Sequence, residues 1–302
     1  MNRLTTACLA ALLIGTAQAH EHGGAQARHI ANAGVMIANG ETRVLFDPLY
    51  NNTFDRYDAI PDDIRAHILA GIHPWDGVDA VFVSHYHEDH FDPAALLELL
   101  ERQPDVHLYG PEQAASAVRQ LVDAETADIM SRVHGVDIAL GDPAERIQIG
   151  TLSIDALRLP HAGWPERHKD VQNIVFRVTL DDTVTAMHLG DADTVDDHFA
   201  PHSEFWAERH TDLALPPYWF FLNAAGRDIL ESRIAARQTI GVHVPAEVSD
   251  DPDQRPAALD GFDVFTRPGE IREIGKQDQS VAVPAVAIPW KIVRSSNAGN
   301  RR

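Results

Sequence analysis

The sequence predicts an α+β domain, and two stretches of different character lead to this fold class. In residues 78–122, strand-like and helix-like segments alternate, and the apolar run 78–83 is followed by a helix that begins at Asp92. In residues 136–189, strand-like runs instead follow one another with only turns between them. Alternation is typical of parallel strands, and consecutive strands are typical of an antiparallel sheet. Since no linker divides the chain, we expect one domain.

The individual elements follow from local signals. Asn39-Gly40 predicts a hairpin turn between the apolar runs 30–37 and 42–46, so the fold should open with a hairpin. The long connection 49–75 contains a helix from 62 to about 70 and is either a lid or surface decoration. Later strands are expected at 136–140, 146–149, 152–159, 171–180, 183–189, 213–215 and 239–244, and later helices at 199–210 and 227–236.

The first residues are typical of a secretory signal peptide. Arg3 precedes a mainly apolar stretch, and Ala17-Gln18-Ala19 supplies the small residues of a cleavage site. We therefore expect residues 1–19 to be removed after Ala19 and the mature protein to be periplasmic or secreted. The apolar stretch is too short to serve as a stable membrane anchor.

Three parts are expected in the remaining chain. Residues 20–29 form a flexible, His-rich leader, residues 30–294 a single domain and residues 295–302 a disordered tail. After cleavage, His20 and His22 would lie at the new amino terminus, where they suit copper(II) or nickel(II). The alternative is a solvated tail without a metal.

Charge and cysteine content exclude two kinds of partner or ligand. The chain has 25 basic and 45 acidic residues and a formal charge of −20, which repels a phosphate backbone and argues against nucleic acid as a substrate. Its one cysteine, Cys8, lies in the signal peptide, so the mature protein has neither a disulfide nor a thiolate metal ligand. The oligomeric state is left open.

A cluster of metal-ligand residue types follows the apolar run 78–83. His85, His87, Asp89 and His90 lie in six residues between the predicted strand and the helix that Asp92-Pro93 begins. Imidazole and carboxylate groups together suit zinc, or a comparable ion such as iron or manganese. The sequence therefore predicts a metal site on this loop.

Further residues of the same types end later strands. His161 follows run 152–159, Asp191 follows run 183–189, and His243 lies in the last predicted strand. Residues at the same end of successive strands converge in space. His168 lies in the same loop as His161 and competes with it as a ligand, whereas His188 lies within a strand and is interpreted as a core histidine.

The order of these residues resembles the metallo-β-lactamase superfamily. The pattern His-x-His-x-Asp-His, a later lone His, a Gly-Asp and a last His is similar to that superfamily over most of the mature chain. The resemblance implies a four-layer αββα sandwich, in which two mixed β-sheets lie face to face with helices outside and the metal site at one edge. It also implies His85, His87 and His161 on one metal, Asp89, His90 and His243 on a second, and Asp191 as the bridge.

The resemblance implies a hydrolase with two divalent metal ions, Zn²⁺ in the first place and Mn or Fe as alternatives, and the signal peptide predicts that this hydrolase is secreted. A metal-bound hydroxide would cleave a lactone, ester or phosphoester of a small-molecule or lipid-derived substrate. Asp89 is the candidate for orienting the water and moving its proton. The alternative is a non-hydrolytic metal- or ligand-binding protein on the same fold.

Within the superfamily, the chain is similar to the branch of the ascorbate-6-phosphate lactonase and the phospholipase D of N-acylethanolamine lipids. Phe46-Asp47-Pro48 and the strand 212–216 carry this likeness. Zinc β-lactamases commonly have a cysteine on the second metal, whereas this chain has Asp191, which counts against hydrolysis of antibiotics.

Other residues are expected around the metals. Asp47 is a candidate acceptor for the outer N–H of a ligand histidine, a role that metal sites commonly require. Trp164, Tyr218 and Trp219 lie in loops that are candidates for substrate contact, although burial against the sandwich explains each of them as well.

Overall fold

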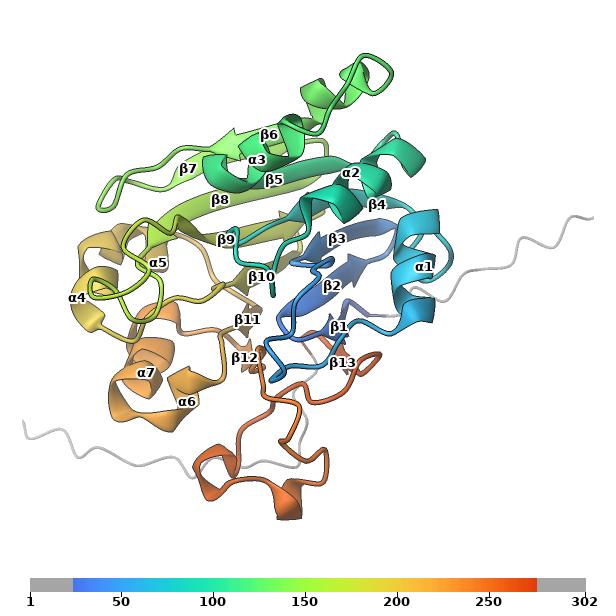
Figure 1. Ribbon diagram of the computed structural model, residues 1–302. Helices are drawn as coiled ribbons and strands as arrows, with labels where there is room; N and C mark the ends of the chain where they lie inside the picture. Colours follow the sequence, from blue (N-terminus) through green and yellow to red (C-terminus); the bar gives the residue numbers. More distant parts are fainter. Residues whose placement is uncertain (1–23, 276–302) are drawn as a thin grey trace, which may run out of the picture.

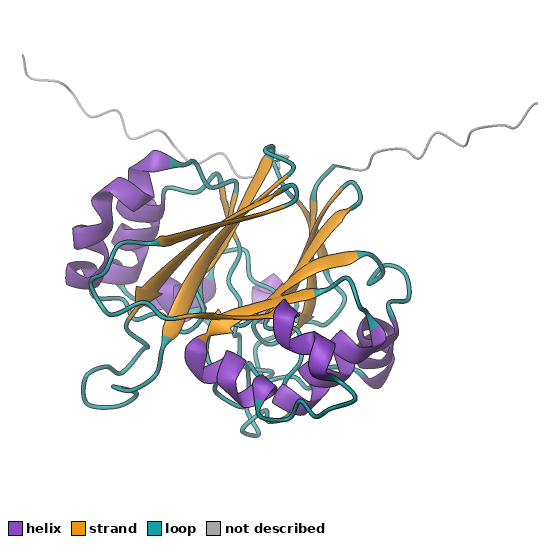
Figure 2. Ribbon diagram, turned by 90° about the horizontal axis from the view of Figure 1, so that it is seen from above, coloured by secondary structure: helices purple, strands orange, loops and turns teal. Residues whose placement is uncertain are grey.

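Two β-sheets lie face to face at the centre of the computed structural model, which describes residues 24–275. Helices cover the outer faces of both sheets, and Figures 1 and 2 show these layers from two directions. The predicted α+β class and αββα sandwich are confirmed. Within residues 24–275, no helix has both the length and the apolar character needed to cross a membrane. The predicted signal peptide, residues 20–23 of the leader, and residues 295–302 lie outside the described part.

Sheet A contains seven strands, which come mainly from the first half of the chain. They are β1 (Gln26–Ala31), β2 (Gly34–Asn39), β3 (Thr42–Phe46), β4 (Val78–Phe82), β5 (His107–Pro111), β6 (Val133–Val136) and β13 (Ile271–Glu273). Their order is β13-β1-β2-β3-β4-β5-β6. β1, β2 and β3 are antiparallel and β3 to β6 are parallel, so the sheet is mixed.

Sheet B contains six strands, which come mainly from the second half of the chain. They are β7 (Glu145–Ile149), β8 (Leu152–Leu159), β9 (Asn173–Leu180), β10 (Val184–His188), β11 (Leu213–Leu215) and β12 (Gln238–Thr239). β7 to β10 form the antiparallel run, and β11 and β12 continue the sheet in parallel with β10. Since β8 and β10 both run antiparallel to β9, their carboxyl ends lie at the same edge.

Helices bury their apolar faces on the outer sides of the two sheets. On sheet A lie α1 (Asp62–Ala70), α2 (Pro93–Arg102) and α3 (Glu112–Arg119), and on sheet B lie α4 (Asp196–Phe199), α5 (Ser203–Glu208), α6 (Trp219–Leu222) and α7 (Ala224–Ile229). The predicted start of α2 is confirmed, because the Asp92 carboxylate accepts hydrogen bonds from the N–H groups of Ala94 and Ala95. This cap holds the carboxyl-terminal end of the His85–His90 loop.

Aromatic side chains from both sheets fill the space between them. Phe82 of β4 lies with its ring centroid 5.0 Å from that of Phe176 in β9 and 5.3 Å from that of Phe46 in β3. All three are essentially inaccessible to solvent. Burying each of these rings stabilises the fold by roughly 1.5–3 kcal/mol. This core fixes the distance between the sheet edges that carry the site.

The structure corrects two predictions about strands in sheet A. Residues 26–29, which we expected in a flexible leader, belong to β1, which pairs with β2 and β13. Within this strand His29 is buried, and its ring stacks on Phe265 at 4.9 Å. A third strand therefore precedes the predicted hairpin β2–β3. The strand expected at 136–140 ends instead at Val136 as β6 of sheet A, and Ile138 is buried between the sheets without pairing in a strand.

Three further boundaries differ from the prediction. The helix expected at 199–210 is divided into α4, a 3-10 turn containing Pro201, and α5. The helix expected at 227–236 begins earlier, as α7, and continues as a π-helical turn to Ile234. The strand expected at 239–244 is reduced to β12 and single bridges, since His243 has a positive φ of 60° that regular strand pairing does not permit.

Candidate metal centre

The predicted ligand residues follow strands of both sheets and meet at one edge of the sandwich. The His85–His90 segment follows β4 in sheet A. His161 follows β8 and Asp191 follows β10, and the two loops are joined by a bridge between His161 and Ala192. His243 follows β12. The expected convergence of strand ends therefore takes place.

A first group combines the nitrogens of His85, His87 and His161. One ligand atom from each lies within 4.8 Å of the others. Nε2 of His85 is 3.1 Å from Nδ1 of His87. The outer nitrogens are used elsewhere: Nδ1 of His85 lies 3.0 Å from Oγ of Ser84, and Nδ1 of His161 lies 2.9 Å from the carbonyl oxygen of Ala162. These contacts orient the rings with Nε2 facing the group.

A second group combines Asp89, His90 and His243, again within 4.8 Å of one another. Nε2 of His243 lies 3.2 Å from Oδ2 of Asp89, and Nε2 of His90 lies 3.8 Å from the same oxygen. His90 and His243 are buried. The second group therefore differs from the first by containing a carboxylate.

Asp191 lies between the two groups and presents one carboxylate oxygen to each. Its Oδ2 is 3.3 Å from Nε2 of His161 and 3.9 Å from Nε2 of His85. Its Oδ1 is 3.2 Å from Nε2 of His90 and 3.4 Å from Nε2 of His243. This division is what a carboxylate that bridges two cations requires.

Several of these atoms are buried and make no hydrogen bond. They are Nε2 of His90, His161 and His243, and Oδ1 of Asp191. Buried polar atoms are normally paired, and unpaired ones in a native structure indicate a missing ligand or ion. The atoms approach each other as ligands do around a common centre, and imidazole with carboxylate is a donor set that divalent metals accept. The residues therefore fit metal binding.

The ionisation of the two groups differs. Burial and the neighbouring imidazoles hold the pKa of His85 well below its usual value and lower the pKa of His87 to about 4. Burial also disfavours charge on His90 and His243, but the negative charge of Asp191 and of the other carboxylates beside them raises the pKa of both. Although burial opposes its charge, Asp191 has a pKa well below its usual value because His243 and His90 lie beside it.

Asp47 has the contact expected of it. It ends β3 with a positive φ of 42°, and its buried Oδ2 lies 2.8 Å from Nδ1 of His90. The N–H and the hydroxyl of Ser84 also donate to this carboxylate, at 2.7 and 2.6 Å. Asp47 thus joins the ends of β3 and β4 and orients His90, a candidate ligand. His188 is a buried core histidine, as predicted, with Nε2 2.9 Å from the carbonyl oxygen of Ala33.

His161, and not His168, belongs to the first group. The ring of His168 borders the group, with its centroid 4.4 Å from that of His161 and 5.0 Å from that of His87. Its backbone has a positive φ of 58°. His168 therefore forms part of the wall of the site.

The aromatic candidates lie at different distances from the ligands. The ring of Trp219 is 5.3 Å from that of His243, and its Nε1 donates to the carbonyl oxygen of Ala192. Tyr218 contacts Trp219 and receives a hydrogen bond from Arg56. Trp164 instead contacts His198, which is not a ligand candidate. Trp219 and Tyr218 thus lie on the His243 side of the site.

Sequence reasoning missed Tyr57, whose ring lies edge-on to His243 with the centroids 4.2 Å apart. Tyr57 belongs to the connection 49–75, for which a lid and surface decoration were both open. The structure places residues 51–58 beside the ligands, since the N–H groups of Asn51 and Asn52 donate to the carbonyl oxygen of Glu88. The long connection next to a metal loop was the available signal, but it did not single out a residue.

Two asparagines that the sequence analysis did not name also hold the ligands in place. Oδ1 of Asn173 accepts a hydrogen bond from the N–H of Asp191 at 2.9 Å. Nδ2 of Asn32 donates to the carbonyl oxygen of Asp89 at 2.9 Å, and the N–H of His243 donates to the carbonyl oxygen of Asn32 at 3.1 Å. A lone asparagine in a turn or at a strand start gives no sequence signal for such a role.

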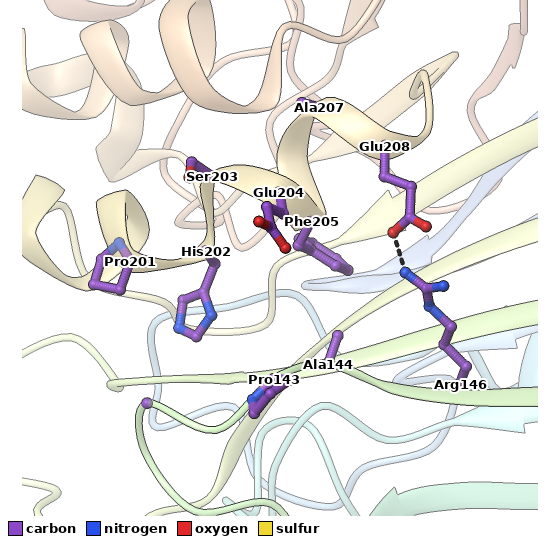
Figure 3. Close-up of a pocket in the computed structure, with 11 residues that line it drawn as sticks. Pro143, Ala144, Arg146, Pro201, His202, Ser203, Glu204, Phe205, Ala207 and Glu208 are labelled. Carbon is purple, nitrogen blue, oxygen red and sulfur yellow. Dashed lines mark hydrogen bonds and ion pairs between the residues drawn. The ribbon is translucent and has the colours of Figure 1, made fainter.

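A cavity of about 760 Å³ lies elsewhere, between the segment before β7 and the helix α5. Figure 3 shows Arg146 turned towards Glu208, with which it forms an ion pair, and His202 facing Pro143. None of the seven ligand candidates lines this cavity. The chemistry is therefore assigned to the sheet edge, where the unpaired ligand atoms are.

Two facing sheets with histidine and aspartate ligands at a shared edge define a metallo-hydrolase fold. A family model described as "Beta-lactamase superfamily domain" matches residues 42–215. This match covers more than half of the chain, and the chain belongs to that superfamily. The family predicted from the ligand pattern is thus confirmed, whereas its finer branch stays a prediction.

Individual proteins resemble this chain in part of their sequence or in their fold. Protein Rv0786c of Mycobacterium tuberculosis (strain ATCC 25618 / H37Rv) is 33% identical over 168 residues, which are 55% of this chain and 64% of that protein. The chain thus matches less than two thirds of this relative's length. The metallo-beta-lactamase fold protein YhfI from Bacillus subtilis has a TM-score of 0.54 and 18% identity, covering 82% of this chain and 98% of that one. Isothiocyanate hydrolase from Delia radicum gut bacteria has a TM-score of 0.53 and 16% identity, with coverages of 82% and 98%.

Proposed function

We propose that this protein is a hydrolase that holds two divalent metal ions, Zn²⁺ in the first place, and cleaves a lactone, ester or phosphoester of a small-molecule or lipid-derived substrate. The observation that carries the proposal is Asp191, whose two oxygens face two separate groups of ligand atoms. His85, His87 and His161 would hold one ion, and Asp89, His90 and His243 the other. The likeness to the lactonase and phospholipase D branch supports this choice of substrates.

The metals would supply a water of lowered pKa and an electrophile for the carbonyl or phosphoryl oxygen. The protein's own groups provide orientation and proton transfer. Asp47 and Ser84 fix His90 and His85 through their outer nitrogens. Asp89 is held ionised: although burial raises its pKa, the adjacent imidazoles of His243 and His90 bring it below the usual value. An ionised carboxylate at this position can take a proton from the attacking water and deliver it to the leaving group.

A panel of chromogenic lactones, esters, phosphodiesters and β-lactams tests the proposal with purified, metal-loaded protein. We expect turnover of at least one of the first three classes and a fall of about 10²–10⁴-fold in Asp89→Asn, the range typical of a lost proton-transfer group. Metal content measured on the same samples should be near two equivalents. Inactivity of the fully loaded protein on the whole panel would instead support the non-hydrolytic metal-binding alternative.

We also propose that residues 1–19 direct export and are removed after Ala19. The charged start, apolar stretch and small-residue site support this. Mass spectrometry of the protein from a periplasmic or culture-medium fraction should give a chain that begins at His20. Recovery of the uncleaved chain from the cytoplasm would contradict it.

A further inference from the structure

The loop formed by residues 51–58 is tied to both groups of ligands. At one end, the N–H groups of Asn51 and Asn52 donate to the carbonyl oxygen of Glu88, at 3.2 and 3.1 Å. At the other, the carbonyl oxygen of Arg56 accepts from the N–H of Ala246 at 2.9 Å, just beyond His243. The backbone of Arg56 is therefore held at the rim of the site, whatever its side chain contacts.

The side chain of Arg56 is a cation without an acidic partner. Its Nη2 donates to the hydroxyl of Tyr218 at 2.7 Å, and its Cζ lies 5.6 Å from the ring centroid of Tyr57. In residues 24–275 no carboxylate lies within ion-pair distance of it, although Asp55 and Asp58 are neighbours in sequence. A guanidinium has five N–H donors, so a single bond to a neutral phenol orients it and leaves most donors free.

The position of Arg56 relates it to the proposed chemistry. Tyr57, the next residue, lies against the ligand candidate His243, and Tyr218 lies beside Trp219, which contacts the same histidine. Tyr57, Tyr218 and Trp219 thus form an aromatic wall on one side of the centre, with Arg56 at its exposed end. A substrate that reaches the ligands along this wall passes within reach of the guanidinium.

The positive charge of Arg56 gives this part of the site a preference for anionic groups. The chain as a whole is strongly acidic, with a formal charge of −20, and repels small anions at long range. Repulsion between exposed charges is screened beyond about 8 Å at physiological salt, whereas a guanidinium in direct contact keeps its full donor geometry. An oriented and unpaired arginine at the rim therefore selects anionic oxygen groups locally.

We propose that the substrate carries a carboxylate or phosphate group close to the bond that is cleaved, and that Arg56 binds this group while Tyr218 positions the guanidinium. The inference rests on the proposed hydrolytic function and narrows its substrate class. It makes Arg56 a determinant of substrate binding and leaves proton transfer to Asp89.

Two esters with the same scissile bond test the inference in the Zn²⁺-loaded protein: mono(4-nitrophenyl) glutarate, which has a distal carboxylate, and 4-nitrophenyl pentanoate, which is neutral. We expect the wild type to prefer the anionic ester. Arg56→Gln should lower kcat/KM for that ester roughly 10- to 100-fold, mainly through KM, as expected for a lost charge-assisted hydrogen bond. The neutral ester should change less than about twofold.

Matched variants distinguish anion binding by Arg56 from a general effect of removing one positive charge and from an effect on folding. Arg56→Lys should recover part of the loss, and Tyr218→Phe should give a smaller rise in KM for the anionic ester alone. Arg43→Gln removes the same charge at the start of β3, at the opposite end of that strand from Asp47, and should change neither ester. Metal content and circular dichroism should be unchanged in all four variants.

Calorimetry provides a readout that does not need turnover and distinguishes the two anions. Zn²⁺-loaded protein is titrated with monomethyl glutarate and with glycerol 3-phosphate, and with methyl pentanoate and glycerol as neutral counterparts. If Arg56→Gln binds one of the two anions at least about tenfold more weakly than the wild type, that anion carries the group that Arg56 recognises. Equal behaviour of Arg56→Gln and Arg43→Gln towards both anions overturns the inference.

The experiments give different results if the inference fails and if the proposed function fails. Turnover of both esters without dependence on Arg56 would leave the hydrolase intact and refute the role of Arg56. Arg56-dependent binding of an anion, in a loaded protein that cleaves nothing, would support the role of Arg56 and refute the hydrolase.

Discussion

The two halves of the candidate metal centre shift the pKa of the same residue type in opposite directions. In the first half, His85 and His87 lie among other imidazoles, and burial lowers the pKa of both, that of His87 to about 4. In the second half, His90 and His243 lie against carboxylates, and the charge of Asp191 raises the pKa of both despite burial. The comparison teaches that neighbouring charge, and not burial alone, sets the pKa of a buried histidine in a metal site.

Asp191 is the group that both halves share, so its removal should have the largest effect. In Asp191→Asn, metal affinity should fall by more than about 100-fold at both positions, because even an outer partner of a ligand is worth about 10- to 100-fold. Elemental analysis after dialysis measures the remaining equivalents. Asp193→Asn is the control, since Asp193 is buried in the same loop but lies 2.7 Å from His198 and outside both groups. Two retained equivalents in Asp191→Asn would refute the bridge.

His161 should affect the first half alone. We expect His161→Ala to lose most of one equivalent of metal after dialysis, because the first position would keep only His85, His87 and the shared Asp191 and so fall short of a complete tetrahedral set. His168→Ala should retain both equivalents, because His168 only borders the group. The reverse result, with loss in His168→Ala, would assign the third ligand to His168.

Replacing Asp47 should reduce metal affinity mainly in the second half of the centre, and by an intermediate amount. Asp47→Asn weakens the contact with Nδ1 of His90, and metal affinity at the second position should fall roughly 10- to 100-fold, whereas the first position, which Asp47 reaches only through Ser84, should change less. Asp79→Asn is a matched control, because Asp79 accepts a bond from Arg43 at the other end of the same strand pair. A uniform loss at both positions would mean that Asp47 supports the loop as a whole.

Competition between protons and metal ions for the histidines should give the smallest effect on metal affinity, and this effect should differ between the two halves. Histidines with a raised pKa in the metal-free protein must release a proton on binding metal, so affinity at the second position should fall with falling pH, by at most about tenfold per proton and pH unit. His87, whose pKa is lowered to about 4, is already neutral at pH 7 and releases none.

Calorimetry in buffers with different ionisation enthalpies counts the protons that each metal ion displaces. The wild type should release more protons with one metal equivalent than with the other. Equal proton release for both equivalents would contradict the difference between the halves.

The sequence predicted most where the signals are local. The candidate ligands His85 to His90 lie between a strand and a capped helix, and His161 and Asp191 directly follow strands, so topology alone brings them together. β8 and β11 were predicted with their observed bounds. Strand β1 was missed because its pattern is polar, and its place depends on pairing with β2 and β13.

Contacts made by irregular segments could not be predicted. Tyr57 and Arg56 reach the site only because the connection 49–75 folds back onto Glu88 and Ala246. Nothing in the identity of these residues fixes that path, since loop conformation depends on the surfaces that it meets. For the same reason, Trp164 and Trp219 were equal candidates in the sequence, although only Trp219 contacts a ligand residue.

The turn at Asn32 also bears on when the site can form during folding. Its side chain holds the backbone of Asp89, and its carbonyl oxygen holds the backbone of His243, so one early residue joins ligands from distant parts of the chain. Contacts across such separations form late, because closing long loops costs entropy before any contact stabilises them. A complete ligand set therefore exists only once the whole sandwich has closed, and metal capture reports on the finished fold.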